Sequence, residues 1–129
     1  MSTSFYSDTG GASVEHKIPL DKTIYFLEER DSGDSGSGTV AVDLTTGNKR
    51  KITLTGSPTL TFTDPVGPTN LIFRLVHGDA AVHTITWPAT VKWPGGNTPT
   101  LSTGTNKVDI VALYFDGTNY YGNVSLNFS

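Results

Sequence analysis

The segment KVDIVALYFDGTNYYGNVSLNF, residues 107–128, carries the strongest structural signal in this chain. Its first half is an almost continuous apolar run, and in its second half apolar or aromatic side chains alternate with polar ones. Between the halves lies Asp116-Gly117-Thr118-Asn119, a sequence typical of the tight turn in a β-hairpin. The segment therefore predicts two antiparallel strands, Lys107–Phe115 and Asn119–Phe128.

A period of two continues on the N-terminal side of this hairpin. In several short segments separated by Gly, Pro and Asn, apolar side chains occupy every second position, which is the pattern of half-buried strands. The strands predicted outside the hairpin are residues 23–28, 40–44, 52–54, 60–62, 70–77, 82–87 and 90–93. We therefore expect an all-β protein with about nine short strands, arranged as an antiparallel, jelly-roll-like β-sandwich.

The composition agrees with this fold class and excludes several kinds of site. The chain holds fourteen Gly and seven Pro, which favour turns, and it is rich in Thr, which favours strands. Cysteine is absent, so the chain forms neither disulfides nor thiolate metal sites. A net charge of −3 provides too little positive charge for general nucleic-acid binding, and no apolar run reaches the ~20 residues of a membrane helix. We expect neither nucleic acid nor membrane as a partner.

The chain is long enough for one hydrophobic core and too short for two. Residues 1–22 are polar and without a lasting period, which predicts an extended N-terminal arm. Residues 23–129 form the predicted β-sandwich domain, and DSGDSGSG at 31–38 predicts a flexible loop within it. No solenoid-type repeat is visible in the sequence.

Several residue groups could carry chemistry, and each has a simpler structural interpretation. Gly33-Asp34-Ser35-Gly36 matches part of a serine-protease motif, with His16 and Asp21 upstream, but a triad needs rigid supporting elements. His77 and His83 flank a turn that contains Asp79, yet zinc needs further ligands. The remaining candidates are an acidic group and a basic group, namely Glu28, Glu29, Asp31 and Asp34 for calcium, and Lys49, Arg50 and Lys51 for phosphate or an acidic partner. We expect no catalytic residue, no cofactor and no metal site.

Aromatic side chains provide a second kind of candidate site. Trp87, Trp93, Tyr120 and Tyr121 form a candidate surface patch, on which sugar rings could stack. The alternative is that these rings belong to the core or to a subunit interface, and we favour this alternative because Trp-Pro pairs commonly fix a loop against a sheet.

Strand Lys107–Phe115 is apolar on both of its sides. One side must fill the core, and the other needs a second layer or a neighbouring subunit. The predicted interface residues come from this strand and from the arm, and they are Phe5, Tyr6, Val14, Ile18, Val111, Leu113 and Phe115.

Residues 39–128 resemble a recurrent module of tailed-bacteriophage virion proteins. The resemblance is carried by VxVxLTTGN at 40–48, ITLTGSPTLTF at 52–62, TWPATVKWPGG at 86–96, PTL at 99–101, and VDIxxLYFDGTxYYG at 108–122. The Trp-Pro element is the most specific of these motifs. Similar stretches occur at the ends of tail-fibre, tail-appendage and head-decoration proteins, and no catalytic residues of the module are known to us.

The resemblance implies a non-enzymatic structural role in the virion. The first candidate is a capsid decoration (cement) protein that is made in the host cytoplasm and binds the major capsid protein on the head, as a homotrimer. The second is a tail-fibre or appendage component that binds host surface carbohydrate. The third, a small hydrolase, is disfavoured because no nucleophile and base lie together on predicted strands.

Overall fold

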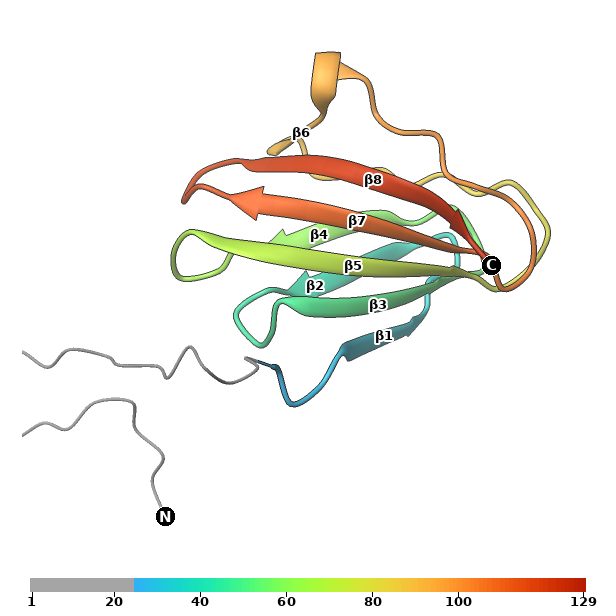
Figure 1. Ribbon diagram of the computed structural model, residues 1–129, viewed down its shortest axis with the longest axis horizontal. Helices are drawn as coiled ribbons and strands as arrows, with labels where there is room; N and C mark the ends of the chain where they lie inside the picture. The colour runs from blue at the N-terminus through green and yellow to red at the C-terminus, as the bar shows by residue number, and fades with distance from the viewer. Residues whose placement is uncertain (1–24) are drawn as a thin grey trace, which may run out of the picture.

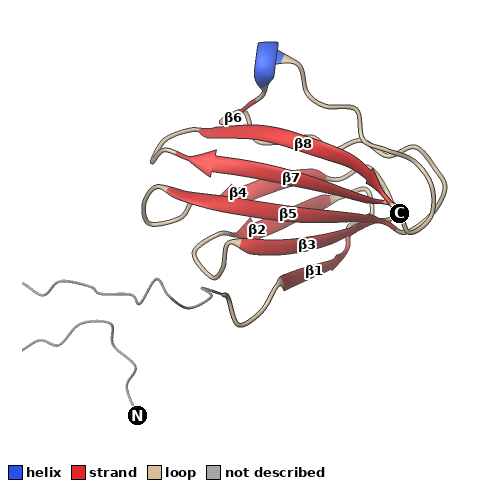
Figure 2. Ribbon diagram, in the orientation of Figure 1, coloured by secondary structure: helices blue, strands red, loops and turns tan. Residues whose placement is uncertain are grey.

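The computed structural model describes residues 25–129, and the predicted arm with Phe5, Tyr6, Val14 and Ile18 lies outside these residues (Figure 1). Within residues 25–129 eight strands form, and the only helical element there is one 3₁₀ turn at Pro94–Gly96 (Figure 2). The strands are β1 (Arg30–Asp34), β2 (Thr39–Asp43), β3 (Lys49–Leu54), β4 (Thr59–Thr63), β5 (Thr69–His77), β6 (Val91–Lys92), β7 (Val108–Phe115) and β8 (Tyr120–Phe128). The predicted all-β class is confirmed.

The strands form two sheets. Six strands make a large sheet in the order β1-β3-β5-β7-β8-β6, and β2 and β4 form a small pair that lies behind it in Figure 1. Within the large sheet only β7 runs against the others, because β1, β3 and β5 are mutually parallel and β8 is parallel to β6. The predicted antiparallel arrangement therefore holds only for β5, β7 and β8, and a jelly roll is not confirmed. Alternation along one strand does not reveal the direction of its neighbour, which is why this detail was predicted wrongly.

The first five strands wind regularly between the two sheets. Odd-numbered strands lie in the large sheet and even-numbered strands in the small one, so each return to a sheet gives a parallel pair. Arg30 pairs with Arg50 and Thr39 pairs with Thr59, so one full turn takes about twenty residues. This winding was not predicted, because successive turns follow the same path through the two sheets without repeating the same residues.

The predicted C-terminal hairpin is confirmed. Phe115 pairs with Tyr120 next to the turn, and Val108 pairs with Phe128 at the open end. Asp116 closes the turn: its backbone N–H donates to the Asn119 carbonyl at 3.0 Å, and its carboxylate accepts the N–H groups of Thr118 and Asn119. Gly117 supplies the positive φ of 105° that this turn requires.

Two N-terminal predictions are wrong. Residues 25–28 of the predicted strand 23–28 are not in a strand, whereas β1 occupies the first half of the predicted flexible loop 31–38. Pairing with β3 outweighs the loop-like composition, and Gly33, with a φ of 77°, accommodates the shift of register between Asp31 and Asp34. The turn after β1 is held in place, because Ser35 N–H donates to the Thr53 carbonyl at 2.8 Å.

The core lies between the two sheets and is formed by alternate side chains of each strand. Its rings include Phe62, Phe73, Phe115 and Tyr120, whose centroids lie 4.5–5.6 Å apart in successive contacts. The buried apolar residues are Val42, Leu44, Ile52, Leu54, Leu60, Leu71, Phe73, Leu75, Ile85, Val91, Leu101, Val111, Leu113, Phe115 and Tyr120.

This core corrects the predicted interface on β7. Val111, Leu113 and Phe115 point inward and are 0–2% exposed, so they offer no surface to a neighbour. The opposite row of β7, which includes Ile110 and Tyr114, points outward. Apart from Asp109 both rows are apolar, and the sequence therefore did not reveal which of them faces the core.

Candidate interaction surface

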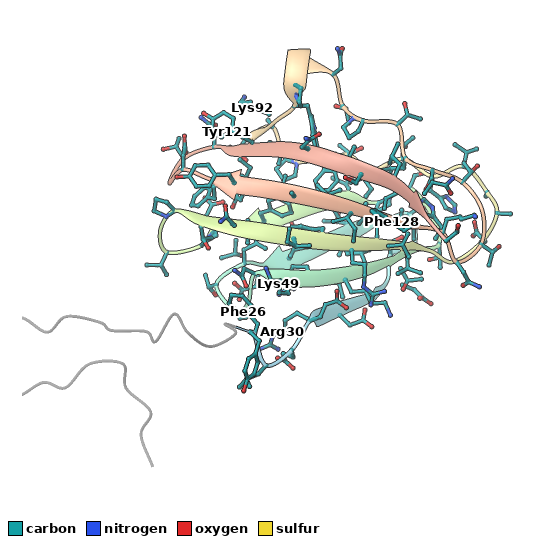
Figure 3. All side chains as sticks on the ribbon, in the orientation of Figure 1. Phe26, Arg30, Lys49, Lys92, Tyr121 and Phe128 are labelled. Atoms are coloured by element: carbon teal, nitrogen blue, oxygen red, sulfur yellow. The ribbon has the colours of Figure 1, made fainter. Side chains whose placement is uncertain are left out.

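The face of the large sheet that points away from β2 and β4 carries an apolar patch. Cross-strand pairing places Tyr114 beside Asn70 and Tyr121, and Val108 between Val76 and Phe128. We call this surface the outer patch, and it consists of Ile72, Val76, Val108, Ile110, Ala112, Tyr114, Tyr121 and Phe128. Tyr121 and Phe128 lie towards opposite ends of β8 (Figure 3), and about half of each side chain is exposed.

Charged side chains cover the same face on β1 and β3, and on β5 the charged Arg74 lies between Ile72 and Val76 of the outer patch. Arg74 donates three hydrogen bonds to the Glu29 carboxylate, and the two shortest run from Nη2 to Oε1 at 2.7 Å and from Nε to Oε2 at 3.0 Å. The hydrogen bond from Arg74 lowers the pKa of Glu29, and the same bond raises the pKa of Arg74. A second ion pair joins Lys51 Nζ and Asp31 Oδ2, which lie 3.6 Å apart. The large sheet therefore has a charged half and an apolar half on its outer face.

These pairs account for the charged groups that the sequence analysis singled out. Three of the four acids proposed for calcium contact cations of the same chain, since Glu28 also lies 3.1 Å from Arg30. The basic trio is split by the pleat of β3: Lys49 and Lys51 point outward, whereas Arg50 is buried and donates from Nη1 to the Asp43 carbonyl at 3.3 Å. No continuous basic surface results from the trio.

The Trp-Pro element lines a cavity of about 560 Å³, which shares no residue with the outer patch. Trp87 and Trp93 contact each other edge to face, with centroids 5.3 Å apart, and both are half-buried. Trp93 packs directly on β8 at Gly122, where an added Cβ would lie 2.5 Å from the indole ring. Gly122 is therefore required for this contact.

The predicted aromatic patch is not one surface. Tyr120 is fully buried and donates its hydroxyl to Asp64 Oδ1 at 2.6 Å. Tyr121 belongs to the outer patch, and Trp87 and Trp93 line the cavity. The favoured alternative, in which these rings pack against the core, is correct for Tyr120, Trp87 and Trp93.

A buried polar network joins the ends of β5, β7 and β8. Asp109 and His77 are both fully buried, and His77 Nε2 lies 3.0 Å from Asp109 Oδ2. The Asp109 carboxylate also accepts the backbone N–H groups of Ser102 and Asn127 at 2.9 Å each, and the Ser102 hydroxyl. Burial alone would raise the pKa of Asp109, but the hydrogen bonds from Ser102, Asn127 and His77 together lower it.

The network contains Ser, His and Asp but does not have the geometry of a catalytic triad. A triad uses opposite ring nitrogens of the histidine for the serine and the aspartate. Here Nε2 of His77 faces both Asp109 and the Ser102 hydroxyl, at 3.0 and 3.4 Å, and Nδ1 is buried without a partner. The network was missed in the sequence, where its signal is one acid at an inward position of the apolar segment 107–115.

The remaining sequence candidates lie apart from one another. His83 Nε2 contacts Asp79 Oδ1 at 2.7 Å, whereas His77 contacts Asp109, so the two histidines do not share a site. The Ser35 hydroxyl donates to the Gly36 carbonyl and accepts the Thr55 N–H, and His16 and Asp21 lie outside the described residues. Within residues 25–129, no three acidic, histidine or cysteine side chains gather in a way that could hold a metal ion.

Comparison with known proteins gives no relative on which to build. No family model, no curated protein and no solved structure matches this chain. The resemblance to phage virion proteins therefore stays a prediction. No helix in the described part of the chain is long and apolar enough to cross a membrane.

Proposed function

We propose that this protein is a non-enzymatic structural component of a tailed-phage virion that attaches through its outer patch. Two arguments support the proposal: the motifs at residues 40–122 resemble virion modules, and residues 25–129 leave the apolar half of the large sheet's outer face uncovered. The outer patch is the observation that carries the proposal, because it places eight apolar or aromatic side chains on one rigid sheet.

The physics of the outer patch favours association. Complete burial of one large apolar side chain contributes roughly 1.5–3 kcal/mol, and Tyr114, Tyr121 and Phe128 are each about half exposed. Side chains on a paired strand lose less conformational entropy on binding than side chains on a loop. A smaller part of the free energy gained by burial is therefore offset. Clustered aromatic residues are also typical of the centres of protein interfaces.

The proposed partners are the major capsid protein and further copies of the chain, with a trimer as the proposed assembly. Among the three candidate roles we favour capsid decoration. The charged half of the outer face, in which Arg74 pairs with Glu29 next to the outer patch, would then form a polar rim beside the apolar contact.

Imaging of virus particles that carry a tagged copy tests the proposal. We expect label over the head lattice, and loss of incorporation when Tyr114→Lys and Tyr121→Lys place two charges on the outer patch. Thr61→Lys is the matched control, because Thr61 is an exposed strand residue of β4 in the small sheet. Normal incorporation of the double variant would contradict attachment through the outer patch, and label on the tail alone would contradict decoration.

The cavity at Trp87 and Trp93 favours a second candidate, a tail component that binds carbohydrate. Indole rings stack on sugar faces, and Lys92 and Thr98 at the same cavity could donate hydrogen bonds. Tryptophan fluorescence during titration with oligosaccharides of the host surface tests this function. A saturable change that Thr98→Arg abolishes by filling the cavity would support it, and an unchanged spectrum would exclude it for the sugars used.

A further inference from the structure

The outer patch is hollowed at Ala112, which has the smallest side chain in the outward row of β7. Cross-strand pairing places Ala112 between Ile72 and Asn123, and the next row of the sheet brings Tyr114 beside Tyr121. These larger side chains surround Ala112 and enclose a hollow of about 440 Å³. The anchor side chain of a binding partner commonly occupies such a pocket in an apolar surface.

The lining of this hollow selects the chemistry of its occupant. Ile72 and the two tyrosine rings favour an apolar anchor. Of residues 25–129, those that line the hollow include no acid, and the single charged one is Lys49, which pairs with Ile72. The Lys49 ammonium group lies 4.9 Å from the centre of the Phe26 ring and forms no ion pair with an acid of residues 25–129. We therefore expect an occupant that combines a large apolar side chain with an adjacent carboxylate.

The chain itself carries this combination in the sequence YFLE at residues 25–28, which we call the knob. Its three apolar side chains are exposed, and Leu27, where the backbone bends, is 93% exposed. Glu28 follows directly, and its carboxylate lies 3.1 Å from Arg30 Nε in an exposed pair. A run of exposed large apolar side chains on a folded domain indicates an interaction site. The knob therefore offers the apolar anchor and the carboxylate that suit the hollow.

Lys49 separates the knob from the hollow of the same molecule. It borders a depression formed with the knob residues and also lines the hollow, and Figure 3 shows it between Phe26 and Tyr121. Because Leu27 is almost fully exposed, it does not occupy the hollow of its own molecule. A knob and a hollow of matching chemistry on one chain are suited to contact between two copies.

We propose that Leu27 of one copy inserts into the Ala112 hollow of a second copy, and that Glu28 pairs there with Lys49. This inference rests on the proposed attachment through the outer patch and not on the virion role. Glu28 loses little when it leaves Arg30, because water already screens that exposed pair. Knob and hollow are different parts of the chain, so repeated contacts can close a ring, and the proposed trimer is such a ring.

The solution mass of the full chain, measured by analytical ultracentrifugation over a range of concentrations, tests the contact. Leu27→Asp removes the apolar anchor, and Ala112→Gln fills the hollow with an uncharged side chain. Each variant should weaken association about tenfold or more. Ala41→Gln is the matched control, because Ala41 is an exposed strand residue of β2 in the small sheet, and it should leave the mass unchanged.

A charge exchange tests the pairing of Glu28 with Lys49. Glu28→Lys and Lys49→Glu should each weaken association about threefold or more, and both changes in one chain should restore it. A mixture of the two single variants should associate better than either variant alone. The reason is that the knob of the Lys49→Glu chain still matches the hollow of the Glu28→Lys chain. A pair within one molecule would not recover on mixing, and absence of recovery would contradict this part of the contact.

We expect a native trimer that dissociates in Leu27→Asp and Ala112→Gln. A dimer with the same response to these variants would support the contact and contradict the proposed trimer. Association that is lost on Tyr114→Lys with Tyr121→Lys, but is unchanged in both test variants, would overturn this inference and leave the proposed attachment through the outer patch intact. A native chain that stays monomeric at every concentration measured would also overturn it.

Discussion

Two networks of charged side chains connect distant parts of the chain to the large sheet, and they differ in what surrounds them. Asp109, on β7, is fully buried and accepts hydrogen bonds from residues 102 and 127. Glu29 lies on the outer face and pairs with Arg74 on β5, where both side chains remain more than one third exposed. The hydrogen bonds of the two carboxylates have similar lengths. A difference in their contributions to stability therefore reflects burial and not geometry. Water can replace the partners of Glu29 and cannot replace those of Asp109.

The largest effect is expected from Asp109→Ala. The substitution leaves the partly buried N–H group of Ser102 and the fully buried His77 ring without their acceptor, and breaking a buried pair in this way costs about 3–5 kcal/mol. Urea unfolding of both proteins measures the loss of free energy of unfolding. Asp31→Ala, at an exposed position of β1, is the control and should change that free energy much less. A loss below about 1 kcal/mol in the Asp109 variant would mean that the network does not hold these segments.

Acid should weaken the buried network through the protonation of Asp109. Its pKa is lowered in the folded protein, so Asp109 contributes stability above its unfolded pKa of about 3.9. That contribution is lost as the pH falls from this value through the lower folded pKa. The decline of unfolding free energy between neutral pH and acid should therefore be shallower in Asp109→Asn than in the native protein. Parallel curves would contradict the assigned contribution.

The hairpin and the winding show how much of this fold could be predicted. The hairpin was predicted because its turn and both alternating strands lie within residues 107–128. The winding depends on partners about twenty residues apart, such as Thr39 and Thr59, whose surroundings in sequence do not repeat. Strand β1 was missed because its Gly and Ser content indicates a loop, and only the pairing with β3 overrides that preference. An apolar interface on β7 was predicted, but it was assigned to the inward row of side chains, whereas the exposed apolar row is the outward one.

Tyr120→Phe tests a contact that is intermediate between the two networks. The Tyr120 ring is fully buried, whereas its partner Asp64 is exposed and can bind water instead. Burial, together with the hydrogen bond to Asp64, raises the pKa of Tyr120, so the hydroxyl stays protonated and donates at neutral pH. We expect a loss of about 1 kcal/mol in thermal or urea unfolding. A loss as large as that of Asp109→Ala would show that the exposed partner matters more than burial.

The smallest effect is expected from the exposed pair. Arg74→Ala should lower the free energy of unfolding by less than about 1 kcal/mol, because solvent screens both charges. The coupling between Arg74→Ala and Glu29→Gln, measured in a double-mutant cycle, should decrease further from low to high salt. A coupling that exceeds 1 kcal/mol and does not respond to salt would contradict the contrast with Asp109.

The position of β6 has a consequence for the order in which the protein is made. In the large sheet β6 lies beyond β8, although β6 leaves the ribosome before either strand of the hairpin. Until the hairpin emerges, the nascent chain displays β5, which contains the apolar segment NLIFRLVH, as an unpaired edge. Such a segment can pair wrongly with other chains. Synthesis of this protein therefore passes through an interval of aggregation risk that ends only when β7 reaches β5, and a chaperone that binds extended apolar segments would find its target there.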